Sequence, residues 1–394
     1  MREVTFASAD RRSKLQIRPG SSADLIRLHF EYAASEIILH RASTRPAVCS
    51  RPAEDTPESN FEIFWRTFAE QYPFFGVRGV DWNAVYQEYR PQVKPSTTPD
   101  ELFKTLSTMI APFSDGHTSL RPKGLKTSYW GSRPDPNPLN EADRKKIFQI
   151  IERKYVRGRL RSFCNEMLSY GILGDSIGYL RIRAFAGYSH NKEFDQGTQA
   201  LETALDDIFK DAERLAGLVV DVRINGGGSD LWGIAVASRL TDREYLAFAK
   251  DARKDIHDTS RFTERQPSWV RPSHRPHFWG PVVELVGINS VSAAETFTMA
   301  LMGRRPQVIR IGEHTQGIFS DILGRTLPNG WNFGLPNERF LTEQGVAFDG
   351  PGIPPHIRVP VFPRSDLESG RDSGIEKAVE ILKSSPNFSS PPRW

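Results

Sequence analysis

Hydrophobic and polar residues alternate through much of the first 52 positions, most clearly in the segments KLQIRP, LIRLHFEY and EIILHRAS. A period of two places successive side chains on opposite faces of a β-strand. Residues 1–52 are therefore predicted to form a small β-rich N-terminal unit.

From residue 53 the hydrophobic spacing becomes that of an α-helix. In NFEIFWRTFAEQY the aromatic residues recur every three or four positions, which places them on one helix face. A second helix is predicted after Thr98, because Thr98 and Glu101 have the spacing of a capping box and Pro99 suits the first helical position. Residues 53–120 are thus expected to be a helical domain that ends in the turn DGH.

The remaining chain has three parts. Residues 121–175 combine a proline- and asparagine-rich loop with a basic amphipathic stretch, and we interpret them as a helical connection or lid. Over 176–365, hydrophobic runs typical of strands alternate with helical patterns, which predicts an α/β catalytic core with a mostly parallel sheet. Residues 366–394 are expected to form a C-terminal helix and a loose tail.

Composition excludes several classes of protein. The chain has 394 residues, 38% hydrophobic and 25% charged, as in an ordinary folded protein. Its 52 basic and 48 acidic residues are scattered, which argues against nucleic-acid binding. Cys49 and Cys164 form no disulfide or zinc pattern, so we expect two buried thiols. Without an HExxH motif, neither a metal nor another cofactor is expected.

No hydrophobic run approaches the ~18 residues of a membrane span, and the N-terminus lacks the apolar centre of a signal peptide. These patterns predict a cytoplasmic protein without a membrane span. If the sequence began downstream of an export signal, a periplasmic or secreted protein would be expected instead.

The segment NSVSAAE, at 289–295, joins a hydrophobic strand to a predicted helix. Ser292 and Glu295 have the spacing of a capping box, a common structural feature. A serine hydroxyl at a helix N-terminus also lies beside free amides and the positive end of the helix dipole, which stabilise negative charge. Ser292 is therefore a helix cap, a nucleophile, or both.

Three glycines at 226–228 follow a hydrophobic strand and precede another helix. They match neither the P-loop, which needs lysine and serine or threonine after its last glycine, nor the dinucleotide fingerprint, which needs glycine where Leu231 stands. The run is either a tight turn or a source of amides for an oxyanion.

His117 is one of nine histidines, and a lone histidine is most often structural. Its tight turn between a helix and a predicted strand would, however, let it act as a base toward a nucleophile from another segment.

Six segments in this order resemble the tail-specific, or C-terminal-processing, serine peptidase family. They are DGHTSL (115–120), IGYLRIRAF (177–185), VVDVRINGGG (219–228), NSVSAAE (289–295), IGEHTQG (311–317) and FDGPGIPPHIRV (348–359). The resemblance implies a crotonase-like (ClpP/crotonase) α/β spiral as the catalytic core. It also implies Ser292 as nucleophile and the amides of Gly227 and Ala293 as the oxyanion hole.

The resemblance further separates two branches of the family by their base. Many members use a lysine after the serine, but Ile318 occupies that place here, and no lysine lies between Ser292 and Lys377. The tricorn-core-like branch uses a histidine from the earlier helical segment, which His117 matches. A serine precedes the histidine in that branch, whereas this sequence has Gly116.

The tricorn-like branch also implies an acidic residue from late in the chain. Asp349 is our candidate for it, with Glu343 and Asp321 as alternatives. The family's PDZ domain is not expected, because only about 55 residues separate DGHTSL from IGYLRI.

The resemblance therefore implies a serine peptidase that hydrolyses peptide bonds of a peptide or protein substrate through an acyl-enzyme. Two other functions stay open on the same fold: binding of hydrophobic ligands without catalysis, and crotonase-like chemistry on acyl thioesters. Assembly into a homo-oligomer is left open as well.

Overall fold

The computed structural model describes residues 3–7, 14–30, 36–46, 53–191, 193–255 and 258–384. Cys49 and most of the predicted C-terminal tail lie outside these ranges. Among the described residues, no helix combines the length and hydrophobicity needed to cross a membrane.

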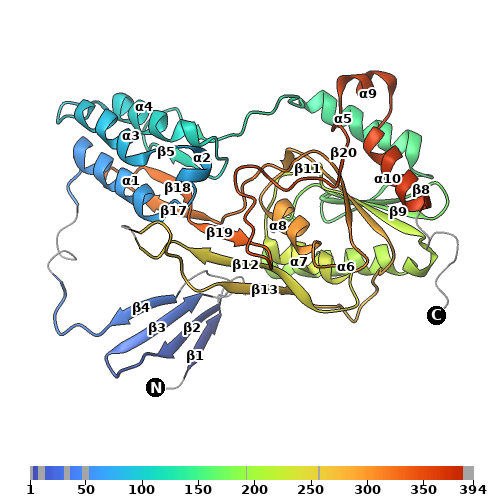
Figure 1. The fold of residues 1–394 in the computed structure, drawn as a ribbon, viewed down its shortest axis with the longest axis horizontal. Helices are drawn as coiled ribbons and strands as arrows, with labels where there is room; N and C mark the ends of the chain where they lie inside the picture. Colours follow the sequence, from blue (N-terminus) through green and yellow to red (C-terminus); the bar gives the residue numbers. More distant parts are fainter. Residues whose placement is uncertain are drawn as a thin grey trace.

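The N-terminal segments with a period of two form an antiparallel four-stranded sheet, shown in blue in Figure 1. Its strands are β1 (Val4–Ala7), β2 (Lys14–Pro19), β3 (Leu25–Phe30) and β4 (Glu36–His40). Their registers gather the hydrophobic side chains on one face, where Phe6 stands opposite Leu15 and Leu28 opposite Ile37. Phe6 and Ile37 are exposed.

The helical part is built on an aromatic core of its own. Its elements are α1 (Pro57–Gln71), α2 (Phe75–Arg78), α3 (Trp82–Tyr89), η2 (Arg90–Gln92), α4 (Pro99–Ile110) and η3 (Ala111–Phe113). The Thr98 capping box predicted for α4 is present. Phe68 packs against Phe113 and Phe333, and Tyr72 stacks on Phe113 at a centroid distance of 4.6 Å.

Phe333 reaches this helical core from far along the chain. It lies in a four-stranded sheet of order β17 (Ile322–Thr326), β18 (Asn332–Pro336), β5 (Ser119–Arg121) and β6 (Tyr129–Trp130). The hairpin β17–β18 therefore belongs spatially with the helices, although it falls within the range 176–365 predicted as the α/β core. Its hydrophobic side chains complete the aromatic core.

The α/β part contains a seven-stranded sheet. In spatial order its strands are β20 (Ile357–Arg358), β16 (Ile309–Gly312), β14 (Val282–Val286), β10 (Gly217–Asp221), β9 (Ile177–Ile182), β8 (Leu168–Leu173) and β7 (Arg161–Phe163). The first five are parallel, as the alternation of strands and helices predicted, and the last two are antiparallel.

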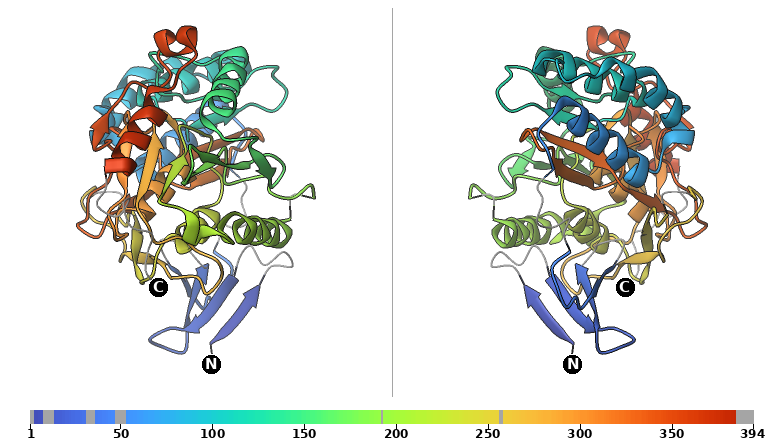
Figure 2. Two further views of the ribbon diagram at one scale, coloured as in Figure 1. Left: turned by 90° about the vertical axis from the view of Figure 1, so that its right-hand side faces the viewer. Right: turned by 90° about the vertical axis from the view of Figure 1, so that its left-hand side faces the viewer.

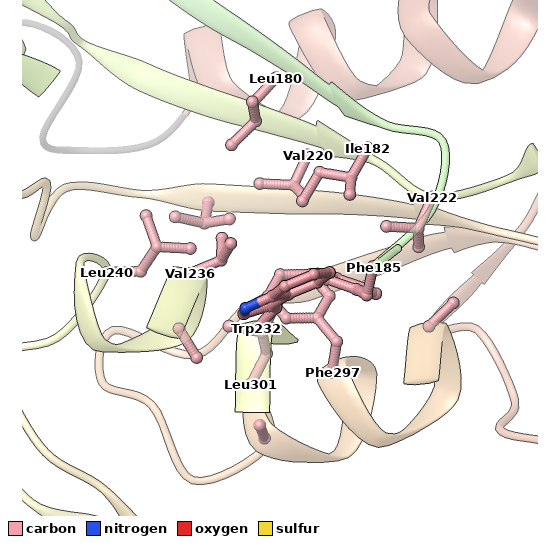
Figure 3. Close-up of a cluster of buried hydrophobic side chains, with 14 of the residues drawn as sticks. Leu180, Ile182, Phe185, Val220, Val222, Trp232, Val236, Leu240, Phe297 and Leu301 are labelled. Atoms are coloured by element: carbon pink, nitrogen blue, oxygen red, sulfur yellow. The ribbon is translucent and has the colours of Figure 1, made fainter. Parts of the chain in front are cut away.

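Helices cover both faces of this sheet (Figures 1 and 2). One face carries α6 (Phe194–Phe209), η5 (Ala212–Arg214), α7 (Asp230–Ser238) and α8 (Ala293–Ala300). The other carries α5 (Glu141–Ile150), α9 (Arg364–Ser369) and α10 (Ser373–Ser384). Figure 3 shows side chains of β9 and β10 meeting those of α7 and α8 in one apolar cluster, with Trp232 and Phe297 at its centre.

The segment 121–175 differs in part from its prediction. Helix α5 and the π-helical turn Ile151–Tyr155 match the amphipathic stretch, but the following residues form β7 and β8. Strand β8 pairs with β9 over six residues. Pairing with a buried sheet overrides local helical periodicity here, so this end of the segment extends the core and is not a lid.

A fourth sheet lies between the helical and α/β parts (Figure 1). It consists of β13 (Gln266–Val270), β12 (Tyr245–Ala252) and β19 (Glu338–Leu341), in that order. The short parallel pair β11 (Ile224–Asn225) and β15 (Asn289–Ser290) follows the ends of β10 and β14. Because β11 leads to the glycine run and β15 leads to Ser292, this pairing brings the two turns side by side.

Candidate active site

Ser292 occupies a strained turn at the start of α8. Its backbone has φ 57° and ψ −116°, a conformation that L-residues rarely adopt. The Ser292 amide donates to the Glu295 carboxylate at 3.2 Å, and the Glu295 amide donates to the Ser292 carbonyl at 2.7 Å. The Glu295 half of the predicted capping box is thus present, and the Ser292 side chain is partly exposed.

Ser290, the other serine of NSVSAAE, is committed to the fold. It is fully buried, and its hydroxyl donates to the carbonyl of Val222 at 2.7 Å and accepts from the amide of Gly287 at 3.1 Å. The Ser290 hydroxyl is therefore structural, and Ser292 is the serine of this segment that is available for chemistry.

Gly227 lies directly against Ser292. A Cβ atom placed on Gly227 would stand 2.8 Å from Ser292 Cβ and 3.3 Å from the amide nitrogen of Ala293. Gly227 also has φ +85°, in the left-handed region that favours glycine. Both the close approach and the backbone conformation require the absence of a side chain at this position.

The backbone amides around this contact differ in their partners. The Gly227 amide donates to Asn225 Oδ1 at 2.9 Å, and the Gly226 amide donates to the carbonyl of Arg183 at 3.2 Å. The amides of Gly228 and Ala293 have no hydrogen-bond acceptor within the described ranges. The Gly227 amide, expected in the oxyanion hole, is thus bound by Asn225, while the neighbouring Gly228 and Ala293 carry the amides that remain available.

Glu295 connects the Ser292 turn to a second segment. Its buried carboxylate accepts from the Thr315 hydroxyl and the Gly317 amide, both at 2.6 Å, and from the Ile318 amide at 2.9 Å. Burial raises the pKa of Glu295 to about 7, and these hydrogen bonds act in the opposite direction. Residues 315–318 are therefore fixed relative to the turn that carries Ser292.

His117 approaches the same segment from the helical side. A Cβ atom on neighbouring Gly116 would stand 2.8 Å from Ile318 Cδ1, and the backbone carbonyl of Ser320 lies beside the His117 ring. Ile318, at the position where the resemblance would place a dyad lysine, is buried. The strip 315–320 therefore lies between the DGH turn and the turn that carries Ser292.

The environment of His117 favours the neutral imidazole. Burial lowers the pKa of His117, although Asp115, the Ser320 carbonyl and Asp321 each raise it. The side chain is 9% exposed, and no described residue provides a hydrogen-bond partner for Nδ1. A neutral histidine at this position could accept a proton. In this conformation, no hydrogen bond between described residues links His117 to Ser292.

Asp115 forms the base of the DGH turn. It accepts from the His117 amide at 3.0 Å, from the Tyr72 hydroxyl at 2.9 Å and from Arg78 at 3.4 Å. The carboxylate is buried, so these donors compensate its charge. The aspartate of the motif thus fixes the loop that presents His117.

Asp349 lies behind the strip 315–320. One carboxylate oxygen accepts from the Phe319 amide at 3.4 Å, and Oδ2 is buried with no partner in the described chain. Burial raises the pKa of Asp349 well above its usual range, and the neighbouring charges of Asp115 and Glu295 raise it further. Asp115 is thus a charged neighbour of both Asp349 and His117.

The two alternative acids occupy different positions. Asp321 is among the charges that act on His117, and it forms an ion pair with buried Lys250. Glu343 lies exposed in the turn that follows β19. Of the two, Asp321 is the one that the structure brings near the histidine.

Two basic residues near the site escaped the sequence analysis. Arg133, from the predicted lid, places Nη1 at 3.1–3.3 Å from the carbonyl oxygens of Thr315, Gln316, Gly350 and Pro351. Lys250 lies on β12, before Ser292 in the chain, whereas a dyad lysine would follow the serine. Its only signal in the sequence is a lysine within the hydrophobic strand YLAFAKDA.

A metal site and a reactive cysteine find no support in the described part of the chain. It contains no cluster of three or more histidine, cysteine, aspartate or glutamate side chains suited to a metal ion. Cys164 is free and half-buried, and burial raises the pKa of its thiol to about 12. A thiol of this kind is not a nucleophile at neutral pH.

Two family models match the regions that carry this site. Residues 176–359 match the model described as peptidase family S41, and residues 53–111 match the tricorn protease C1 domain. The first match contains Ser292, the glycine run and Asp349. The second covers helices of the domain that supports His117.

Similar proteins agree with these matches. The chloroplastic C-terminal processing peptidase of Tetradesmus obliquus is 27% identical over 203 residues, a match that covers 50% of this chain and 38% of the algal protein. The structure of a peptidase candidate from Parabacteroides merdae is 28% identical, with a TM-score of 0.72, and covers 86% of this chain and 100% of that one.

The structure of mature CPAF complexed with lactacystin is similar in fold. It has a TM-score of 0.62 at 12% identity and covers 86% of this chain and 98% of that one.

Proposed function

We propose that the chain is a serine peptidase with Ser292 as nucleophile and His117 as general base, because residues 176–359 match peptidase family S41 and residues 53–111 match the tricorn protease C1 domain. The observation that carries this proposal is the meeting of three distant turns. The Ser292 turn touches Gly227 on one side, and on the other it is tied through Glu295 to the strip that contacts the DGH turn.

The reaction would be acyl transfer to water. His117 accepts the proton of the Ser292 hydroxyl as Oγ attacks the carbonyl carbon of a peptide bond. The amides of Ala293 and Gly228 donate to the resulting oxyanion. His117 then gives its proton to the departing amine, and water repeats the sequence on the acyl-enzyme to release the second product and restore the Ser292 hydroxyl.

Asp349 is the proposed acid that orients His117. His117 Nδ1 and Asp349 Oδ2 are both buried without a partner in the described chain. His117 lies beside the Ser320 carbonyl, and Asp349 accepts from the amide of the adjacent residue, Phe319. A small shift on substrate binding would let them share a proton, and catalytic hydrogen bonds are often long before substrate binds. This shift would satisfy both atoms.

We assign the catalytic core to the crotonase-like spiral. The α/β part contains two successive units in which a parallel strand, a short paired strand and a helix follow each other: β10–β11–α7 and β14–β15–α8. This repetition supports the assignment. It also explains why the glycine run and Ser292, which follow the short strands of the two units, lie together.

The proposed substrate is a peptide or a protein. The algal relative is a C-terminal processing peptidase. A preference for substrate C-termini here would have to come from the cleft itself, because the sequence between DGHTSL and IGYLRI is too short for a PDZ domain.

An active-site label tests the proposal. A fluorophosphonate should modify the wild-type chain at Ser292, as shown by peptide mapping, and the label should be absent from Ser292→Ala. The same samples should be assayed on a mixture of peptides with free and blocked C-termini. Modification at another serine, or saturable binding of hydrophobic ligands without labelling or cleavage, would contradict the proposal.

A further inference from the structure

Lys250 is a buried cation at the centre of an acidic cluster beside the proposed site. Its side chain on β12 is 5% exposed. Nζ lies 2.6 Å from Asp321 Oδ2, 3.6 Å from Glu338 Oε2 and 3.8 Å from Asp230 Oδ2. It also lies 4.6 Å from the ring centroid of Phe340, on the neighbouring strand β19. An ammonium so enclosed is retained only with partners of opposite charge.

One of these partners belongs to the nucleophile side. Asp230 begins α7, two residues after Gly228, and its Oδ1 accepts from the Thr296 hydroxyl at 2.7 Å. Thr296 lies in α8, and its amide donates to the Ser292 carbonyl at 3.1 Å. Asp230 therefore joins the end of the glycine run to the helix that carries the nucleophile.

Another partner belongs to the histidine side. Asp321 follows Ser320, whose carbonyl lies beside the His117 ring, and the negative charge of Asp321 raises the pKa of His117. The Asp321 side chain is 64% exposed, and its Oδ2 accepts from Lys250 Nζ at 2.6 Å. Lys250 is thus the group through which Asp230 and Asp321 are connected.

Lys250 is unsuited to act as a base. Burial lowers the pKa of Lys250, but the attraction of Asp321, Asp230 and Glu338 outweighs burial, and the pKa is raised above its usual value. The side chain therefore stays protonated at every pH at which a peptidase would work, and its effect on catalysis must act through its neighbours.

We propose that Lys250 is a positioning residue. It contacts the end of the glycine run (226–228) through Asp230 and the His117 segment through Asp321, and so fixes these two segments relative to each other. This inference rests on the peptidase activity proposed above. By neutralising Asp321, Lys250 also limits the negative charge that His117 experiences. The other titratable groups to consider at His117 are Asp115 of its own turn, which Arg78 of α2 binds, and Asp349, the proposed orienting acid.

The expected effects on the pH profile have opposite signs for the two partners. Lys250→Met removes a positive charge near His117, so the pKa of His117 should rise and the acidic limb of kcat/KM should move to higher pH. Asp321→Asn removes a negative charge, so the limb should move to lower pH. Each shift should be about half a pH unit to one unit, and a purely structural defect would produce neither.

The test compares these variants with two controls. Lys250→Met should lower kcat about 10- to 100-fold and slow fluorophosphonate labelling of Ser292, whereas Lys250→Arg, which keeps the charge, should recover most of the activity. Lys254→Met, at an exposed lysine four residues further on, should match the wild type. If Lys250→Met does not fold, the Asp321→Asn profile still tests the proposal, because Asp321 is mostly exposed.

Each outcome has a distinct meaning. Equal activity in Lys250→Met and Lys254→Met, or shifts of the same sign in Lys250→Met and Asp321→Asn, would overturn the positioning role. So would labelling that depends on Lys250 but persists in His117→Ala, since Lys250 would then be the base. Failure of the wild-type chain to label at Ser292 would instead refute the peptidase proposal on which this one rests.

Discussion

The two halves of the proposed site are built in different ways. The nucleophile half stands on strand–turn–helix units of the α/β core, and the Glu295 carboxylate there accepts hydrogen bonds from three amides and one hydroxyl. The histidine half stands on the separate aromatic core of the helical part. In that half His117 Nδ1, Asp349 Oδ2 and Arg78 Nε are buried with no partner in the described chain.

This difference indicates which half is complete before substrate arrives. Unsatisfied buried polar atoms are unfavourable, and a native protein that retains them often uses them in binding or catalysis. The turn that carries Ser292 is therefore preorganised by the bonds to Glu295, whereas the histidine half would reach its working geometry when substrate fills the cleft. Four substitutions break or sharpen this contrast.

The largest effect is expected for Ser292→Ala. Removing the proposed nucleophile should lower kcat by about 10⁴- to 10⁶-fold on any substrate that the wild type cleaves, because the acyl-enzyme cannot form. A discontinuous peptide assay with mass-spectrometric detection would measure it. Residual cleavage within 10-fold of the wild type would show that the chemistry lies elsewhere.

His117→Ala should follow, with a loss of about 10³- to 10⁴-fold in kcat/KM and slower fluorophosphonate labelling. His274→Ala is the matched control, because His274 is exposed in a loop and should be neutral. Equal labelling rates in the two variants would remove His117 from the mechanism.

Gly227→Ala should lower kcat by about 100-fold and reduce stability by about 1–3 kcal/mol. The added Cβ would lie 2.8 Å from Ser292 Cβ on a backbone with positive φ, so the nucleophile turn must move. Gly226→Ala is the control, since a Cβ there meets nothing within 4 Å. The kcat and the urea unfolding free energy of both variants test this prediction. Equal values for Gly227→Ala and Gly226→Ala would mean that the turn tolerates the added Cβ.

Asp349→Asn should have the smallest catalytic effect, a loss of about 10-fold in kcat. The variant should also gain stability, by an amount that depends on pH. The pKa of Asp349 is raised in the folded chain above its unfolded value, so wild-type stability falls as pH rises toward the folded pKa. Asparagine cannot ionise. Thermal unfolding at pH 5 and pH 8 should show a larger gain for the variant at pH 8, and a gain confined to pH 5 would contradict the assignment.

The sequence predicted most of the nucleophile half. A strand, a capped turn and a helix around Ser292 are local features, and so are the glycines that lie against it. It could not predict that the Gly227 amide is bound by Asn225, because this depends on the exact path of the turn. Lys250 was missed because its role depends on carboxylates between 20 and 88 residues away in the chain.

The histidine half was harder to predict for the same reason. His117 was found through its turn, but the partners of the buried acids follow from how the helical part docks on the α/β core. Strands β7 and β8 lie in the segment predicted as a helical connection or lid. They were missed because sheet pairing outweighed the helical periodicity of the sequence.

The backbone angles at Ser292 have a consequence for the evolution of this fold. A residue held at φ 57° and ψ −116° lowers the stability of the whole fold by about 1–3 kcal/mol, and only glycine would adopt these angles freely. A lineage that no longer needed cleavage would therefore gain thermal tolerance by exchanging this serine for glycine. The Ser292→Gly protein should melt at a higher temperature than its parent. A lower melting temperature would show that these backbone angles do not destabilise the fold.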